Sequence, residues 1–147
     1  MQEPIRIEPG QAGGRPPEYP PGKTFSRYFT LDEAASLVPT LRGLLDEAVA
    51  ELDEAKDAIV LYKRILMTRK KAGHPPNAEE LALLKRKYKR YEDIATGWVE
   101  RFERLGILVR DLEQGLADFP YHSRTLDRDF LLCWRREEDG IFYFHEP

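Results

Sequence analysis

The sequence has only one cysteine, Cys133, among its 147 residues. A single thiol excludes an internal disulfide and any zinc site built from several cysteines. The sequence also lacks an apolar run close to the ~20 residues that a membrane-spanning helix needs, and no apolar segment follows its first residues, as a secretory signal would require. We therefore expect a cytoplasmic protein that does not enter the membrane.

Several catalytic signatures are missing as well. The sequence contains no glycine-rich phosphate loop, no GxSxG nucleophile elbow and no HExxH zinc helix. Its net charge of −3 argues against nucleic-acid binding by overall charge, although it leaves room for a local basic patch. Whether the chain is an enzyme stays open.

Proline and glycine are concentrated at the N-terminus. Residues 1–24 hold six of the eleven prolines and four of the ten glycines, with few apolar side chains. Such a segment cannot bury enough surface to offset the entropy lost on ordering. We predict a disordered tail over residues 1–24 and a single domain over residues 25–147.

A long helix is predicted to follow. The sequence Thr30-Leu31-Asp32-Glu33 forms a capping box, which sets the start of the helix. Apolar residues then alternate at steps of four and three to about Lys71, and Pro39 either separates a short first helix or kinks a long one. The apolar seam consists of Ala34, Val38, Leu41, Leu45, Ala48, Leu52, Ala55, Ile59, Tyr62 and Leu66.

A second helix is predicted after a turn at residues 72–76, where Gly73 suits a C-terminal cap and two prolines prevent continuation. Asn77 would cap this helix and Gly106 would end it. Two matched seams joined by a short turn predict an antiparallel helical hairpin over residues 25–106. The second seam consists of Leu81, Leu84, Tyr88, Tyr91, Ala95, Trp98, Phe102 and Leu105.

The remaining residues change to a strand-like pattern, with short apolar runs at 107–109, 116–119, 130–134 and 141–145. We expect Pro120 to end the second run, and residues 137–140 to form the hairpin turn between the last two. The predicted fold class is α+β: a long antiparallel helical hairpin with a small C-terminal antiparallel β-sheet of three or four strands over residues 107–147.

Short motifs along the chain carry a family resemblance. They are Phe29-Thr30-Leu31-Asp32-Glu33-Ala34, Leu37-Val38-Pro39, Gly106-Ile107, Val109-Arg110-Asp111-Leu112, Gly115-Leu116, Asp118-Phe119-Pro120, Leu131-Leu132-Cys133-Trp134 and His145-Glu146. In these motifs the chain resembles the bacterial family called domain of unknown function 2203. The resemblance supports the predicted fold and directs attention to the C-terminal cluster, but it implies no reaction.

The sheet region holds a candidate site for a divalent metal ion, formed by Asp118, Cys133, His145 and Glu146. If the last two strands pair, Cys133 and His145 approach each other, and with Asp118 they could form a mixed N/O/S metal site or a Cys–His pair. In the alternative interpretation these residues have structural roles only: Asp118 caps a turn, Cys133 packs in the core and His145 forms a local hydrogen bond. We expect His122 to lie in a solvated loop.

Charge is strongly segregated in the predicted hairpin. The segment from Lys63 to Arg90 contains ten basic residues and two acidic ones, so it carries a net charge of +8 and the rest of the chain carries −11. The basic end is a plain solvated face, or binds nucleic acid or a ribosome, or meets the acidic stretch around residues 46–57 of a second copy. The candidate nucleic-acid-binding residues are Lys70, Lys71, Lys85, Arg86, Lys87, Lys89 and Arg90.

Apolar residues outside the seams favour the second copy, because a two-helix hairpin buries only its facing stripe. They are Leu37, Leu44, Val49, Val60, Leu61, Ile65, Leu83 and Val99. The leading hypothesis is therefore a non-catalytic interaction or scaffold protein that forms a homodimer through its hairpin. The alternatives are a nucleic-acid-contacting module and a small metal-binding enzyme or sensor.

Overall fold

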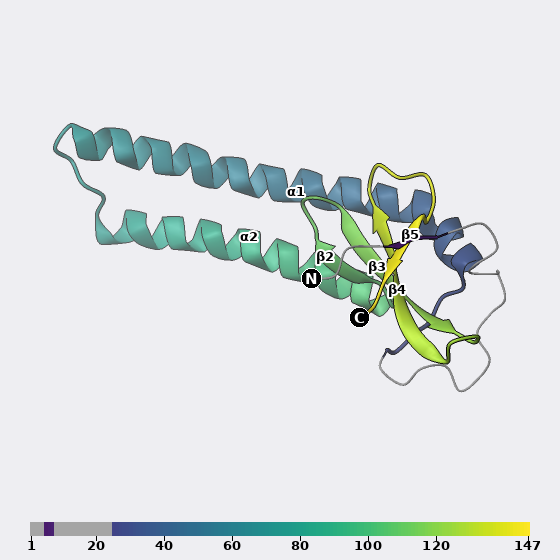
Figure 1. The fold of residues 1–147 in the computed structure, drawn as a ribbon. Helices are drawn as coiled ribbons and strands as arrows, with labels where there is room; N and C mark the ends of the chain where they lie inside the picture. The colour runs from purple at the N-terminus through teal and green to yellow at the C-terminus, as the bar shows by residue number, and fades with distance from the viewer. Residues whose placement is uncertain (1–4, 8–24) are drawn as a thin grey trace. The chain divides into compact units, whose positions relative to one another are not determined.

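A computed structural model describes residues 5–7 and 25–147, and most of the predicted disordered tail lies outside these residues. Two helices are followed by a sheet, which confirms the α+β class (Figure 1). The helices are α1, Leu31–Lys71, and α2, Ala78–Arg104. The strands are β1, Ile5–Arg6; β2, Leu108–Asp111; β3, Leu116–Ser123; β4, Arg128–Arg135; and β5, Tyr143–His145.

Helix α1 begins with the predicted capping box. The Thr30 hydroxyl accepts a hydrogen bond from the Glu33 amide at 3.0 Å, and the Glu33 carboxylate accepts one from the Thr30 amide at 3.0 Å. Pro39 lies inside one continuous helix of 41 residues, so no separate short helix precedes it. A proline removes one backbone hydrogen bond, and the remaining bonds of a helix this long maintain it across that gap.

The turn between the helices also follows the prediction. Gly73 has a φ of 89°, a left-handed conformation that favours glycine. A second capping box then starts α2, because the Asn77 side chain accepts a hydrogen bond from the Glu80 amide at 2.9 Å. Arg69 pairs with Glu80 next to the turn, and the Trp98 indole donates to Glu51 further along both helices. The two helices are therefore antiparallel.

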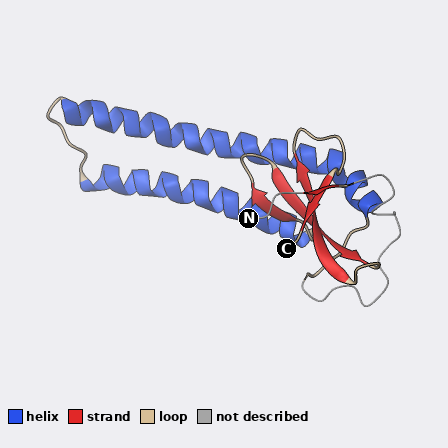
Figure 2. Cartoon of the chain, viewed as in Figure 1, coloured by secondary structure: helices blue, strands red, loops and turns tan. Residues whose placement is uncertain are grey.

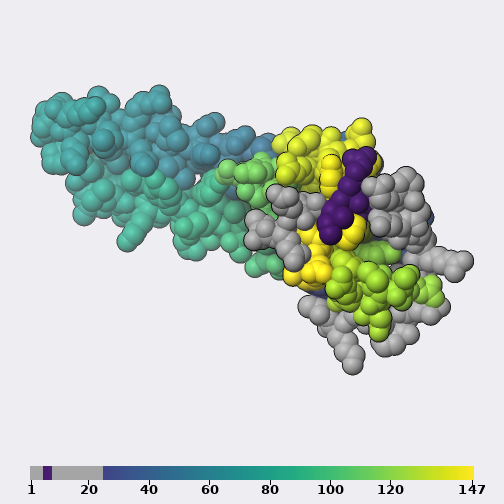
Figure 3. Space-filling view, viewed as in Figure 1, coloured from purple at the N-terminus to yellow at the C-terminus, as the bar shows by residue number. Residues whose placement is uncertain are grey.

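The five strands form one antiparallel sheet in the order β1-β5-β4-β3-β2. Figure 2 shows the strands in red. The prediction of three or four strands missed β1, where Ile5 pairs with Phe144 and Arg6 with Tyr143. Figure 3 shows this strand in purple against the yellow C-terminal residues. Two residues are too few for a detectable alternating pattern, and the surrounding prolines and glycines argued against a strand.

The prediction that Pro120 ends its strand was wrong, because β3 continues to Ser123. Within a strand, the N–H and C=O of one residue point to the same side. The Pro120 carbonyl accepts a hydrogen bond from the Phe29 amide at 2.8 Å and so points away from β4. The nitrogen of Pro120, which carries no hydrogen, therefore faces the side of β3 beyond the end of β2. For this reason Pro120 removes no hydrogen bond from the ladder with β4.

The connection between β4 and β5 is longer than the predicted turn and is held by Arg42 of α1. Its guanidinium donates to the carbonyl oxygens of Arg136 at 2.9 Å and Glu138 at 2.6 Å. The Trp134 indole donates to the same Glu138 carbonyl at 3.0 Å. These bonds satisfy backbone groups that have no strand partner.

The chain divides into two units. The sheet unit comprises residues up to Leu45 together with Val99–Pro147, and the hairpin unit comprises Asp46–Trp98. Neither α1 nor α2, within the described chain, combines the length and apolar content required of a membrane-spanning segment. The core of the sheet unit includes Phe29, Val38, Leu41, Leu45, Phe102, Ile107, Phe119, Leu132 and Trp134. The buried apolar residues of the hairpin unit are Ala48, Leu52, Ala55, Ile59, Leu66 and Trp98.

Candidate metal centre

Three of the four predicted metal ligands come together on one face of the sheet. Asp118 of β3 lies directly opposite Cys133 of β4, and Cys133 lies opposite Tyr143 of β5. Because side chains alternate between faces, His145, two residues after Tyr143, shares the face of Asp118 and Cys133. One ligand atom from each of the three lies within 4.8 Å of the others, and no other such group occurs in residues 5–7 and 25–147.

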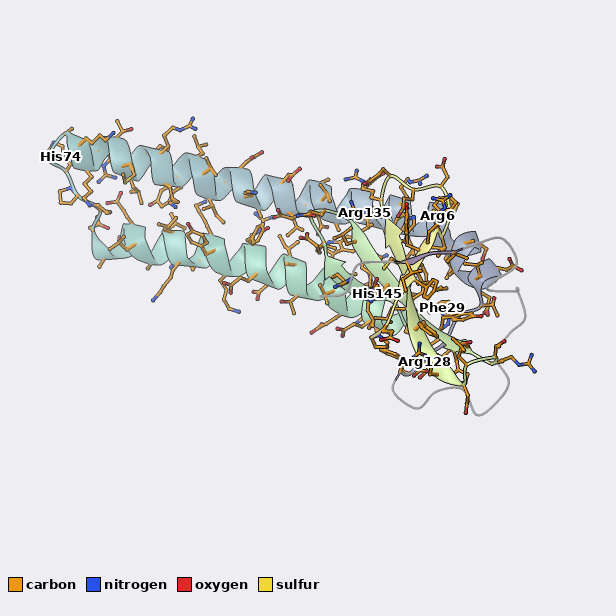
Figure 4. The ribbon with its side chains drawn as sticks, in the orientation of Figure 1. Arg6, Phe29, His74, Arg128, Arg135 and His145 are labelled. Carbon is orange, nitrogen blue, oxygen red and sulfur yellow. The ribbon has the colours of Figure 1, made fainter. Side chains whose placement is uncertain are left out.

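His145 is buried and oriented by the backbone (Figure 4). Its Nδ1 lies 2.8 Å from the carbonyl oxygen of Glu146. A carbonyl oxygen only accepts, so Nδ1 carries the hydrogen, and in the neutral ring Nε2 presents its lone pair to the cluster. Nε2 lies 3.3 Å from a carboxylate oxygen of Asp118. This arrangement is typical of metal-binding histidines, whose second nitrogen is held by a carbonyl or carboxylate.

Arg110 joins this group and was not predicted as a site residue. It lies in β2, where the register shifts between Val109 and Asp111. Its Nη1 is 3.1 Å from His145 Nε2, and its Nε is 3.4 Å from the Asp118 carboxylate. The guanidinium therefore bridges two acceptors. Only the family motif that contains Arg110 could have suggested a role, because a lone arginine in a strand gives no signal of its own.

Burial controls the protonation of the acidic groups. It raises the pKa of Asp118, while the positive charge of Arg110 acts in the opposite direction. Burial also raises the pKa of Cys133, and the charge of Asp118 and a hydrogen bond to it raise that pKa further, to about 12. At neutral pH the thiol is therefore protonated, which argues against an activated Cys–His nucleophile, since only the thiolate is reactive.

Glu146, the fourth predicted ligand, does not point its carboxylate into the cluster. That carboxylate lies 2.9 Å from an Arg128 guanidinium nitrogen, and Glu146 instead contributes its backbone carbonyl to His145. Asp111 caps a turn by accepting a hydrogen bond from the Gln114 amide at 2.9 Å. The candidate metal ligands in the structure are thus Asp118, Cys133 and His145. We call these three residues, together with the neighbouring Arg110, the Asp118 group.

The prediction that His122 lies in a solvated loop was wrong. His122 is buried in β3, because that strand extends past Pro120. Its Nδ1 lies 2.8 Å from the Asp129 carboxylate, and its Nε2 lies 3.3 Å from Asp127. The Tyr28 hydroxyl donates to the other Asp129 oxygen at 2.7 Å. This second cluster is fully hydrogen-bonded and is separate from the Asp118 group.

The seven predicted nucleic-acid-binding residues lie in the hairpin unit, and all but Lys87 are exposed. Lys87 is half-buried, with its nitrogen 5.4 Å from the ring centroid of Tyr62 on α1. Lys89 pairs with Asp93 at 2.9 Å. The other predicted binding residues of α2, Lys85, Arg86 and Arg90, are exposed, and Arg86 and Arg90 lie about one helical turn apart.

The comparisons with known proteins agree with this organisation. The model of a family described as an uncharacterised conserved protein, DUF2203, matches residues 27–147. No curated protein and no solved structure matches the chain. The matched region covers both helices, strands β2 to β5 and all four residues of the Asp118 group. The chain therefore belongs to the DUF2203 family.

Proposed function

We propose that this protein binds a divalent transition-metal ion through Asp118, Cys133 and His145. The observation that carries the proposal is the convergence of one oxygen, one sulfur and one nitrogen ligand from three different strands within 4.8 Å. Strands hold their side chains more rigidly than loops do, so a site built on them is preorganised.

The ligand set favours zinc. Zinc accepts cysteine, histidine and carboxylate ligands together, at about 2.0–2.3 Å, and tetrahedral geometry then places neighbouring ligand atoms about 3.5 Å apart. The three atoms would each move inward by less than about 1 Å to reach that spacing. Three protein ligands leave the fourth position open, as in zinc sites that bind water or substrate.

Metal binding would also change the charges of the site. Cys133 must lose its proton to bind, and a thiolate with the Asp118 carboxylate would balance the two charges of the ion. Arg110 would give up its contact with His145 Nε2, which the metal takes over. It is about one-third exposed and therefore has room to move outward. Its positive charge beside the open position favours an anionic fourth ligand.

Titration of the metal-free full chain with Co²⁺ tests the proposal. A cobalt–thiolate bond gives a ligand-to-metal charge-transfer absorption band, and we expect one equivalent of Co²⁺ to produce it and excess Zn²⁺ to remove it. Cys133→Ser should abolish the band. His145→Ala should weaken cobalt binding by more than about tenfold, because loss of a mere outer-shell partner of a metal ligand already costs about that much.

His74→Ala is the matched control, because His74 is exposed in the turn between the helices (Figure 4). It should bind cobalt as the wild type does. If wild-type protein gives no charge-transfer band, or if His74→Ala and His145→Ala weaken binding equally, the Asp118 group is a structural hydrogen-bond network and the proposal fails. Far-ultraviolet circular dichroism of each variant separates loss of binding from loss of folding.

A second candidate function is supported by α2. Lys85, Arg86 and Arg90 form an exposed basic face on one side of the helix, with Lys89 beside them. Such a face attracts a phosphate backbone through release of counterions. A gel shift with single-stranded RNA at low salt tests this function. Lys85→Glu with Arg86→Glu should abolish the shift, and absence of a shift with the wild type would exclude it.

A further inference from the structure

We propose that two copies of this chain associate antiparallel through one exposed face of α1 in the hairpin unit. This face, the outer stripe, contains residues spaced alternately four and three apart, which is the spacing of one side of a helix that packs on a partner. All of its side chains are exposed. They are Asp46, Ala50, Asp53, Asp57, Val60, Arg64, Met67 and Lys71.

Charge along the outer stripe changes sign in the middle. The acidic residues Asp46, Asp53 and Asp57 precede Val60, whereas the basic residues Arg64 and Lys71 follow it. A single copy therefore presents an acidic half and a basic half on one helix. Two such stripes are complementary only if they run in opposite directions.

An antiparallel pair related by a two-fold axis fits this pattern residue by residue. With the axis between residues 58 and 59, Asp53 of each copy faces Arg64 of the other, and Asp46 faces Lys71. Each ion pair occurs twice, because a two-fold contact is symmetric. A parallel pair in the same register would instead place Asp53 against Asp53 and Arg64 against Arg64, so the charges also select the direction.

The apolar residues of the outer stripe match only in part in the same register. Ala50 faces Met67, an apolar pair, whereas Val60 faces the acidic Asp57 next to the axis. Val60 is 47% exposed and Met67 52% exposed, and Leu61, on the flank of the stripe, is 59% exposed. A second copy would cover these side chains, which the hairpin unit alone leaves in water.

The seam between the two helices does not compensate for this exposure. Leu81 and Tyr88, predicted to be buried against α1, are 51% and 41% exposed. Trp98 is the only residue of α2 in the hairpin unit that is buried. The hairpin unit therefore holds little apolar core of its own and gains more from a partner than a well-packed unit would.

Sedimentation equilibrium of the full chain after nuclease treatment tests the proposal. We expect a reversible association from 17.1 kDa to twice that mass at micromolar concentration, weakened by salt. Asp53→Arg and Arg64→Asp should each raise the dissociation constant about tenfold, since each replaces two attractive pairs by two repulsive ones. An equimolar mixture of the two variants should regain the wild-type affinity, because the heterodimer restores opposite charges at both contacts.

Arg86→Asp is the matched control, with the same change of charge on α2 outside the outer stripe. It should dissociate as the wild type does. A wild type that stays at 17.1 kDa overturns the proposal, as does association that disappears with nuclease, which would make nucleic acid the partner. Failure of the mixture to regain affinity would also overturn it. None of these outcomes depends on metal binding.

Discussion

Asp118 lies directly opposite Cys133 across β3 and β4, and its carboxylate helps to hold the thiol in the protonated form. Burial is the larger contribution to the raised pKa of Cys133, and the neighbouring negative charge adds to it. The two residues therefore form a pair that resists ionisation of the thiol until a cation replaces its proton. The first prediction follows from this relationship.

Cys133 should react slowly with thiol reagents in the metal-free protein. With a pKa of about 12, its thiolate fraction at about pH 8 is at least a hundredfold below that of an ordinary cysteine. Alkylation by iodoacetamide, followed by mass spectrometry, should be correspondingly slow in the native state and should become normal in guanidinium chloride. Equal rates in both conditions would show that the thiol is not held in this way.

Replacing Asp118 by Asn should accelerate that alkylation, because the substitution removes the negative charge while keeping the shape of the side chain. Asp127→Asn is the control, since Asp127 is exposed and belongs to the His122 cluster. It should leave the alkylation rate unchanged. A faster reaction in both variants would indicate general loosening of the sheet.

Arg110→Ala should increase the affinity for Zn²⁺. The guanidinium lies 3.1 Å from His145 Nε2 and 3.4 Å from Asp118, so it repels a cation at the same place and competes for the same acceptors. Removing its charge should tighten binding at least about tenfold, as measured by competition with a chromophoric chelator. Weaker binding in this variant would mean that Arg110 supports the site and does not compete with the metal.

The stability of the metal-free protein should depend on Asp118 in a definite direction with pH. Burial raises the pKa of Asp118 above 3.8, so the folded protein holds this proton more tightly than the unfolded chain. The stability that the proton contributes is complete below the ordinary pKa and is lost as the pH rises through the raised value. Asp118→Asn cannot titrate, so its stability relative to the wild type should improve with rising pH, by at most about 1.4 kcal/mol per pH unit. Urea unfolding at several pH values measures this difference, and an unchanging difference would contradict it.

Two glycine substitutions should have opposite effects. Gly106 has a φ of 84°, and a Cβ there would lie 2.7 Å from the Cβ of Arg27, so Gly106→Ala should destabilise the protein by about 1–3 kcal/mol. Gly97 lies within α2 with open space around its Cα, so Gly97→Ala should stabilise by about 0.5–1 kcal/mol. Thermal unfolding of both variants measures the contrast. The same sign for both would contradict it.

Most of the fold could be predicted because its signals are local. The capping boxes at Thr30 and Asn77, and the left-handed glycines at positions 73 and 106, each act within a few residues. Pro120 shows where local reasoning fails. Whether a proline interrupts a strand depends on which side of the strand its nitrogen faces. Here the Phe29 amide donates a hydrogen bond to the Pro120 carbonyl from about ninety residues away in the sequence.

The site was predictable only in part for a similar reason. The positions of Asp118, Cys133 and His145 follow from strand alternation once the strands pair in order. Arg110 lies on the same face because it follows by two residues Leu108, which pairs with Asp118, but a lone arginine in a strand gives no sequence signal of its own. The prediction that Glu146 is a metal ligand was wrong, because its carboxylate forms an ion pair with Arg128 on the neighbouring strand.

The boundary between the sheet unit and the hairpin unit falls inside both helices, after Leu45 in α1 and after Trp98 in α2. No linker exists there at which either unit could be separated from the other. Cutting at these points would expose the backbone amides and carbonyls of a severed helix, which have no partners of their own. The two units therefore have to be produced as one piece, and a shortened hairpin can be obtained only by removing matched turns from both helices.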